Sequence, residues 1–204
     1  LIRSKLTPRT KVILPVHLFG MPADMEPITA LAKEHNLHVI EDAACGFGAR
    51  YFGKHVGNFG DAGCFSFHPR KAITTGEGGM VTTGNQDLAK KIRRLRDHGA
   101  EVTDLQRHMG SRPYLLTDHI VAGYNQRMTD IQGALGAAQM KRAQEILEER
   151  RVLAIRYDVA FGELDWLSTP KVEDGYEHGY QSYPCLFNPN KVNNDSISLI
   201  NSKR

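Results

Sequence analysis

Residues 64–79 read Cys64-Phe-Ser-Phe-His-Pro-Arg-Lys-Ala-Ile-Thr-Thr-Gly-Glu-Gly-Gly79 and combine three signals. The apolar start predicts the end of a short strand, which we expect over residues 62–67. A loop that contains Lys71 follows this strand. The glycines of the second half then permit a tight turn into another strand, expected over residues 79–83. A short strand, a loop and a glycine-rich turn in this order favour an α/β sheet with a functional edge.

Two runs before this stretch predict a β-α-β unit. Residues 11–18 form a nearly continuous apolar run, which is typical of a strand buried on both faces. A helix is expected over residues 24–36, with Asp24 as its N-cap. Residues 37–42 then predict a second short strand. Strands joined through a helix in this way are parallel neighbours in one sheet.

The rest of the chain is expected to be helical at two places. Leucine and isoleucine spacing predicts a helix over residues 86–98. Residues 101–125 are polar and aperiodic, and a loop of this length tends to be functional or to lie at an interface. Thr129 opens a pattern that predicts one long helix to about residue 164, which we interpret as a bridge between two lobes. Residues 179–187 predict the first strand of the second lobe.

These elements predict an α/β fold with a mostly parallel sheet flanked by helices. We expect residues 1–128 to belong to a large domain, residues 129–164 to form the interdomain helix, and residues 165–204 to begin a small α/β domain. The chain opens on Leu1 and stops shortly after an apolar strand. This favours a segment of a longer protein, with the N-terminal part of the large domain and most of the small domain outside it.

Composition excludes several classes of protein. Of the 204 residues, 24% are charged and 41% are hydrophobic, which indicates a globular chain. No apolar run approaches the ~18 residues needed to span a bilayer, so we expect no membrane partner. The net charge of +3 and the lack of a basic stripe interleaved with aromatic residues argue against nucleic acid as a partner. The three cysteines are far apart and fit neither a disulfide framework nor a metal site. We therefore expect a reducing compartment, the cytoplasm.

Asp42 and Lys71 are the candidate reactive pair. Asp42 ends one predicted strand and Lys71 lies just beyond another, so both are expected at the same edge of the sheet. A structural ion pair is the simpler interpretation of this spacing. The surrounding residues favour chemistry instead, because a lysine that forms an imine needs a partly desolvated site to lose its proton.

Pyridoxal phosphate is the aldehyde cofactor that suits these residues. It needs a carboxylate opposite its ring nitrogen, for which Asp42 is available. Its phosphate needs hydroxyls and backbone N–H groups, for which Ser66 and the glycine-rich turn are candidates. Each feature alone is weak, whereas their order along the chain is specific.

Seven motifs together resemble the DegT/DnrJ/EryC1/StrS family of pyridoxal-phosphate-dependent sugar aminotransferases over roughly residues 8–187. The Phe65–Lys71 and Thr74–Gly79 motifs are most similar to the perosamine-synthase type, which aminates C4 of nucleotide-linked keto-deoxy sugars. The motifs are Pro15–Gly20, Glu41–Ala44, Gly57–Asp61, Phe65–Lys71, Thr74–Gly79, Arg96–Gly99 and Gly123–Asp130.

The resemblance implies an aspartate-aminotransferase-like fold (fold type I) and a homodimer with shared active sites. It implies that an amino acid, glutamate in our hypothesis, donates the amino group to a nucleotide-linked sugar for polysaccharide biosynthesis. Lys71 is then the Schiff-base lysine and proton shuttle, and Asp42 the partner of the pyridinium nitrogen. Ser66 is a phosphate ligand, and Asn125 reaches the phosphate of the cofactor in the neighbouring subunit.

Cys45 departs from the family pattern. The position three residues after Asp42 often holds Gln in the family, where it bonds the ring oxygen of the cofactor, and a thiol is a weak donor. Two alternative functions stay open. One is a related sugar dehydratase, against which Lys71 argues because those members carry His at its position. The other is a truncated family member that does not turn over.

Several neighbouring residues have two interpretations each. His17 is either a packed histidine or a substrate contact, and His68 is a candidate for the substrate or cofactor pocket. Glu77 is expected to brace the glycine-rich turn, while Cys64 is expected to be a core thiol.

Overall fold

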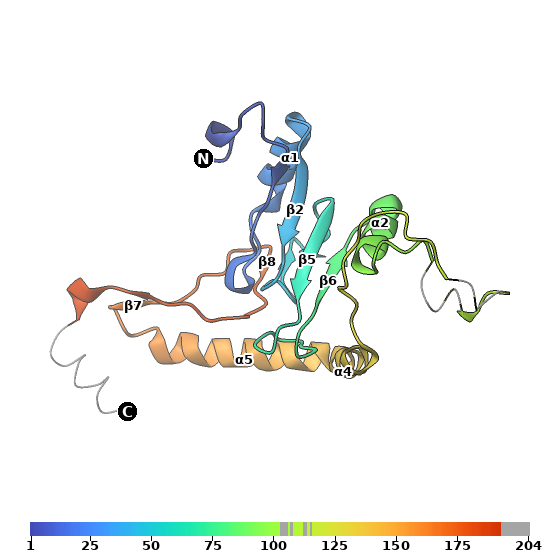
Figure 1. Cartoon of the computed structure of the whole chain (residues 1–204). Coiled ribbons are helices and arrows are strands. Elements are labelled where there is room, and N and C mark those ends of the chain that lie inside the picture. The colour runs from blue at the N-terminus through green and yellow to red at the C-terminus, as the bar shows by residue number, and fades with distance from the viewer. Residues whose placement is uncertain (103–105, 107, 112–113, 115, 193–204) are drawn as a thin grey trace.

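The computed structural model describes residues 1–102, 106, 108–111, 114 and 116–192. Its centre is a four-stranded sheet in the order β1-β2-β5-β6 (Figure 1). Strands β1, β2 and β5 are parallel, and β6 is antiparallel to β5. The mostly parallel sheet is thus confirmed. The bounds are Val12–Ile13 for β1, His38–Asp42 for β2, Ala62–Ser66 for β5 and Gly79–Thr82 for β6.

The predicted β-α-β unit is present. Helix α1, Met25–Glu34, joins β1 to β2 and packs against both strands. Asp24 occupies the N-cap position, but its side chain makes no capping hydrogen bond. It accepts a hydrogen bond from the Tyr51 hydroxyl at 2.7 Å instead. The core of the unit contains Ile13, Met25, Leu31, Ala32, Val39 and Tyr51.

The first strand is covered on one face only, so the prediction of a strand buried on both faces is wrong in this structure. Ile13 is buried against α1, whereas Leu14 and Val16 on the other face are 58% and 45% exposed. The regular strand is also short, since β1 ends at Ile13 and Val16 forms an isolated bridge to Asp42. An apolar run shows that a strand can be buried. Which of its faces is buried depends on the elements that pack against it.

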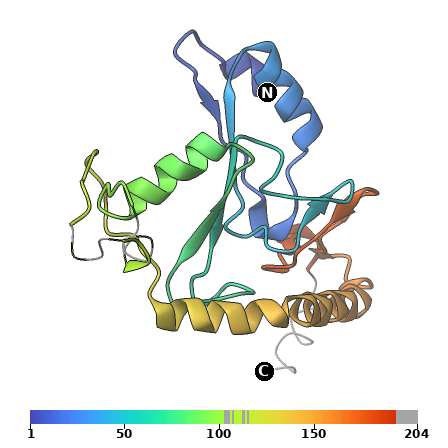
Figure 2. The same ribbon diagram turned by 90° about the vertical axis from the view of Figure 1, so that its right-hand side faces the viewer.

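The predicted single helix after Thr129 is two helices. Thr129 caps the first through a capping box with Gln132. The break is at Arg142, where φ is −102° and ψ is 7°. Figure 1 shows α5 from the side and α4 nearly end-on, and Figure 2 shows the reverse, so the helices run in different directions. The bounds are Asp130–Lys141 for α4 and Ala143–Phe161 for α5.

The break has a local cause that periodicity does not reveal. The Arg142 N–H bonds the carbonyls of Gln139 and Met140, which closes α4. The Arg142 guanidinium bonds Glu145 in the first turn of α5 at 2.9 Å. An apolar stripe continues on both sides of one non-helical residue, and therefore the pattern reads as one helix.

Helix α2, Gln86–Arg96, confirms the remaining helical prediction, and the Asn85 side chain caps it. The predicted loop over residues 101–125 lies partly outside the described residues. In its described part, the Glu101 N–H bonds the Asp118 carbonyl at 2.9 Å, and His119 pairs with Ala100 just before the loop. No helix among the described residues is long and apolar enough to cross a bilayer.

Two small antiparallel sheets and three short 3-10 helices complete the described chain. Of the predicted strand over residues 179–187, only Leu186–Phe187 is a regular strand. Earlier in this segment, the N–H groups of Gly179 and Ser182 donate to the carbonyls of Gly20 and Phe19, which are not in a strand. The strands are Arg50–Tyr51 (β3), Lys54–His55 (β4) and Tyr176–Glu177 (β8) in one sheet, and Leu167–Ser168 (β7) and Leu186–Phe187 (β9) in the other. The 3-10 helices are Arg3–Lys5 (η1), Leu18–Gly20 (η2) and Pro189–Lys191 (η3).

Candidate active site

Asp42 and the Lys71 loop lie at the same edge of the central sheet. Asp42 is the last residue of β2 and is the register partner of Cys64 in the parallel strand β5. Strand β5 ends at Ser66, and the chain then enters the loop that carries Lys71. Parallel strands end at the same edge, so the expected placement of these residues is confirmed.

Lys71 and Cys45 are in direct contact. The Lys71 Nζ lies 3.1 Å from the Cys45 Sγ, and both residues are half-buried. Cys45 follows Asp42 by three residues, in the turn that leaves β2. The polar atoms of the lysine and of the strand-end turn therefore converge, although 26 positions separate Lys71 from Cys45.

The Asp42 carboxylate faces a small cavity of about 250 Å³ on the open side of the sheet. Its Oδ1 accepts a hydrogen bond from the Ala44 N–H at 3.0 Å. Leu14, Ile40 and Cys64 provide apolar or weakly polar lining beside it. A carboxylate with one engaged oxygen beside a small apolar space can hold a protonated ring nitrogen.

Cys64 lies on this open side, so its interpretation as a core thiol is wrong. The residue is exposed, because residue 64 of β5 points to the face that carries Asp42. Partial burial and the Asp42 carboxylate raise the pKa of the Cys64 thiol, which keeps it protonated and unreactive near neutral pH.

The loop between β5 and Lys71 is held by hydrogen bonds within it. The Ser66 Oγ accepts from the His68 N–H at 3.3 Å, which leaves the hydroxyl proton available to a ligand. The Lys71 N–H donates to the His68 carbonyl at 2.9 Å. The His68 Nδ1 accepts from the Arg70 N–H at 3.2 Å. His68 thus supports the loop, and its ring lies 4.0 Å from the Glu77 carboxylate.

The glycine-rich turn is braced by threonine side chains. Thr74 Oγ1 donates to the Phe67 carbonyl at 2.9 Å, and Thr75 Oγ1 donates to the Glu77 carbonyl at 2.7 Å. Helix α4 holds the same turn, because Gln132 Nε2 donates to the Glu77 carbonyl at 3.1 Å. The backbone of Glu77, more than its exposed carboxylate, is therefore the braced group.

His17 is the packed histidine and not a ligand contact. Its ring is fully buried, and its Nδ1 accepts from the Ala23 N–H at 3.0 Å. The Nε2 must then carry the proton, which it donates to the Glu41 carboxylate at 3.0 Å. Glu41 and Asp42 are adjacent and alternate across the strand, so Glu41 points to the buried face while Asp42 points to the open one.

Asn125 is not brought to Lys71. Its backbone pairs with Asp97 at the end of α2, and Asn125 is exposed. The described residues thus bring Lys71, Cys45, Asp42 and Ser66 to one edge and leave Asn125 in another part of the chain.

Gln181 is a residue of this region that the sequence reasoning missed. Its amide bonds the backbone on both sides of Lys71, at Arg70 and Ala72. The contact spans more than a hundred positions, so neither spacing nor composition points to it.

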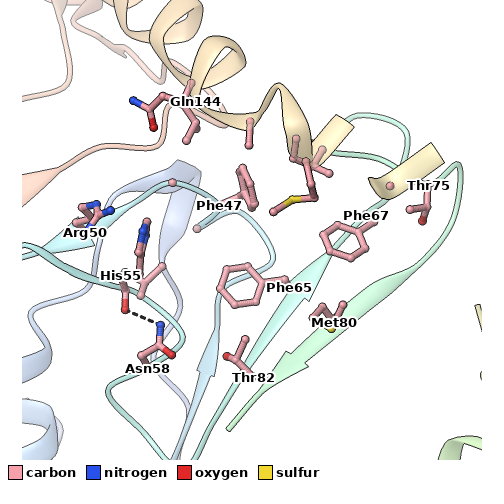
Figure 3. A pocket seen from close by; sticks show the side chains of 18 of the residues that line it. Phe47, Arg50, His55, Asn58, Phe65, Phe67, Thr75, Met80, Thr82 and Gln144 are labelled. Carbon is pink, nitrogen blue, oxygen red and sulfur yellow. Dashed lines mark hydrogen bonds between the residues drawn. The ribbon is translucent and has the colours of Figure 1, made fainter. Parts of the chain in front are cut away.

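A larger cavity, of about 750 Å³, lies between the sheet and helices α4 and α5 and is separate from the lysine. Figure 3 shows Phe47, Phe65 and Phe67 pointing into it, with Arg50 and His55 at one end. Lys71, Asp42 and Cys45 are not among its lining residues. Its lining includes the charged or titratable side chains of Arg50, His55, Arg151 and Glu177 but no lysine. A lysine is the residue that forms an imine, so we place the candidate chemistry at the strand edge that carries Lys71.

Comparison with known proteins agrees with the geometry of this edge. The family described as the DegT/DnrJ/EryC1/StrS aminotransferase family matches residues 1–202. The chain belongs to this family. Its members are pyridoxal-phosphate-dependent aminotransferases, so the resemblance and the expected fold are confirmed.

Three relatives illustrate the similarity. GDP-perosamine synthase of Caulobacter vibrioides is 48% identical over 149 residues, which are 73% of this chain and 37% of the relative. The structure of Helicobacter pylori PseC, an aminotransferase involved in the biosynthesis of pseudoaminic acid, superposes with a TM-score of 0.83 at 31% identity, covering 93% of this chain and 48% of PseC. The PLP-form of Spr1654 from Streptococcus pneumoniae superposes with a TM-score of 0.79 at 25% identity. The match covers 92% of this chain and 50% of Spr1654. The chain spans about half the length, or less, of the relatives it matches.

Proposed function

We propose that the whole protein transfers an amino group from an amino acid, with glutamate as the donor, to a nucleotide-linked keto-deoxy sugar. The observation that carries this proposal is the meeting of Lys71, Cys45 and Asp42 at the carboxyl edge of β2 and β5. Family membership supports the class of reaction, and the similarity to GDP-perosamine synthase supports the class of substrate.

The residues at this edge fit pyridoxal phosphate. The Asp42 carboxylate keeps one oxygen beyond its bond to Ala44, so it can hold the ring nitrogen in its protonated form. The Ser66 hydroxyl has a proton to donate to a phosphate oxygen. When bound, the cofactor supplies an electron sink for the carbon that carries the amino group.

Lys71 supplies the nucleophile and the mobile proton. Its Nζ would hold the cofactor covalently and, once released, would move a proton from the donor amino acid. A general acid–base group of this kind contributes about 10²–10⁴-fold to rate. The Cys45 sulfur, a weak acceptor, lies beside this nitrogen at 3.1 Å.

The wider organisation belongs to the proposal as well. We place residues 1–128 in the large domain, residues 129–164 in the link and residues 165–204 at the start of the small domain. The proposed form is a cytoplasmic homodimer with shared sites, in which Asn125 reaches the phosphate in the neighbouring subunit. The exposure of Asn125 is compatible with such a contact.

The decisive experiment is covalent trapping at Lys71. The purified protein is incubated with pyridoxal phosphate, reduced with borohydride and digested, and the modified peptide is identified by mass spectrometry. We expect the adduct on Lys71 in the wild type and in Lys91→Ala, which removes an exposed lysine of α2, and none in Lys71→Ala. Amino transfer should fall at least about 10²-fold in Lys71→Ala. An adduct of unchanged yield in Lys71→Ala would refute the assignment.

A further inference from the structure

Gln181 bonds the backbone on both sides of Lys71. Its Oε1 accepts from the Ala72 N–H at 3.2 Å. Its Nε2 donates to the Arg70 carbonyl at 2.7 Å. One side chain therefore holds the residue before and the residue after the lysine.

The segment that carries Gln181 is itself firmly attached, so the glutamine is a fixed support. The Gly179 N–H bonds the Gly20 carbonyl at 2.8 Å, and the Ser182 N–H bonds the Phe19 carbonyl at 3.1 Å. From α5, the Arg150 guanidinium bonds the Tyr180 carbonyl at 2.9 Å. These bonds anchor the backbone on both sides of Gln181 to two other parts of the molecule.

The backbone at the tip of the Lys71 loop is otherwise held by hydrogen bonds within the loop, so Gln181 is a support from a distant part of the chain. Arg70 and the preceding proline are exposed, and Lys71 itself is half-buried. Within the loop, the Lys71 N–H bonds only across the turn to His68. A reactive amine has to be held to within a fraction of an ångström to react efficiently, and a displacement of about 1 Å can cost about 10²-fold in rate.

We infer that Gln181 is the positioning residue for Lys71, which aims the lysine nitrogen by holding the backbone at Arg70 and Ala72. This inference rests on the proposed function of Lys71. The Gln181 amide can make both bonds at once, because its oxygen accepts and its nitrogen donates. A glutamate at position 181 keeps the acceptor for Ala72 and loses the donor to Arg70, and a leucine loses both.

Two measurements test the inference. The first is hydrogen exchange of the Ala72 amide, which needs no cofactor. The second is the rate at which pyridoxal phosphate forms a borohydride-reducible adduct on Lys71, followed from pH 6 to pH 10. In Gln181→Leu we expect faster Ala72 exchange, an adduct rate lower by about tenfold and a shifted pH profile. Gln181→Glu should keep the Ala72 amide protected and recover part of the rate.

Gln139→Leu is the matched control, because it removes one glutamine bond to the same loop three residues beyond Lys71. The Gln139 Oε1 accepts from the Thr74 N–H at 2.9 Å. We expect faster exchange at Thr74 with an adduct rate near that of the wild type. Urea unfolding checks that each variant is folded, and Gln181→Glu serves where the leucine variant is not.

The outcomes separate the two proposals. A wild type without an adduct on Lys71 overturns the proposed function, together with the inference that depends on it. A wild type that forms the adduct, with an unchanged rate and pH profile in the folded Gln181 variants, overturns the inference alone. Unchanged Ala72 exchange in Gln181→Leu also overturns it, since the bond would then not restrain the loop.

Discussion

At the residue scale, Glu41 is a buried carboxylate that organises the loop before β5. It accepts hydrogen bonds from the backbone N–H groups of Gly57, Phe59 and Gly60 at 2.6, 2.6 and 2.8 Å, and from His17. Burial by itself would raise the pKa of Glu41, but the bonds from His17 and from this backbone outweigh burial and lower it. Glu41 therefore stays ionised and acts as a structural centre, while its neighbour Asp42 faces the site.

Glu41→Gln should destabilise the protein strongly. The amide keeps one acceptor oxygen but presents an NH₂ group to backbone donors that are buried, which leaves them unpaired. We expect a loss of about 3 kcal/mol in the free energy of unfolding, measured in urea. Glu34→Gln removes an exposed carboxylate that pairs with Arg3, and it should change stability little. Equal effects of the two substitutions would contradict the structural role of Glu41.

His178 should make the protein sensitive to acid. Its ring is 4% exposed, and burial lowers the pKa of His178 from 6.5 to about 4. The unfolded chain then binds a proton below about pH 6.5 that the folded protein binds only near pH 4, so stability is lost as pH falls through this window. The free energy of unfolding should fall by roughly 3 kcal/mol between about pH 6.5 and pH 4.

Urea titrations from pH 7 to pH 4 measure this dependence. His178→Phe should flatten the slope of stability against pH. Stability should still fall somewhat with pH in His178→Phe. The pKa of Glu41 is lowered in the folded protein, so the stabilisation that ionised Glu41 provides is also lost in acid. A His178→Phe slope identical to that of the wild type would refute the assignment.

At the element scale, β5 fits closely against the loop that Glu41 holds. A Cβ at Gly63 would lie 2.3 Å from the Gly57 Cα and 2.6 Å from its carbonyl oxygen. Both atoms belong to backbone, which cannot move away cheaply. The strand that leads to Lys71 thus depends on a glycine for its position.

Gly63→Ala should therefore be destabilising by about 3 kcal/mol, at the upper end of the cost of overpacking. Gly84→Ala is the control, because a Cβ there meets nothing within 4 Å. Thermal and urea unfolding of both variants measure the difference. If Gly63→Ala unfolds like Gly84→Ala, the close packing of β5 against Gly57 is wrong.

At the scale of the whole molecule, the last described part of the chain returns to α5 and to the Lys71 loop. The Tyr183 hydroxyl donates to the Asp158 carboxylate of α5 at 2.5 Å, and burial together with this carboxylate raises the pKa of Tyr183. Arg151 of α5 bonds Glu177 at 3.3 Å. These side-chain bonds keep residues 176–183 against α5, and with them the segment that positions Gln181.

Tyr183→Phe should lower the free energy of unfolding by about 2 kcal/mol, because it removes a hydrogen bond to a charged acceptor. It should also accelerate exchange of the Ala72 amide, since the Gln181 segment loses a tie to α5. Tyr157→Phe changes a neighbouring ring of the same aromatic cluster, and we expect a small effect. Unchanged Ala72 exchange in Tyr183→Phe would show that Tyr183 does not support the loop.

Local sequence patterns were enough to predict most helices and strands, and the sheet edge at which Asp42 and Lys71 lie. Periodicity and capping residues predicted α1, α2 and the start of α4, and the order of motifs predicted the family. The shared edge of Asp42 and Lys71 followed as well, because parallel strands end together. These features depend on the conformation of neighbouring residues, which local sequence reports directly.

Three features became visible only in the folded chain. They are the open face of β1, the break at Arg142 and the bonds of Gln181 to the Lys71 loop. A single non-helical residue leaves the apolar stripe intact, and an apolar strand does not specify which of its faces is covered. The path of the chain brings Gln181 beside Lys71 across 109 to 111 positions, and no local pattern encodes that meeting. The position of Lys71 at the sheet edge could therefore be predicted from the sequence, whereas the bonds from Gln181 to its loop could not.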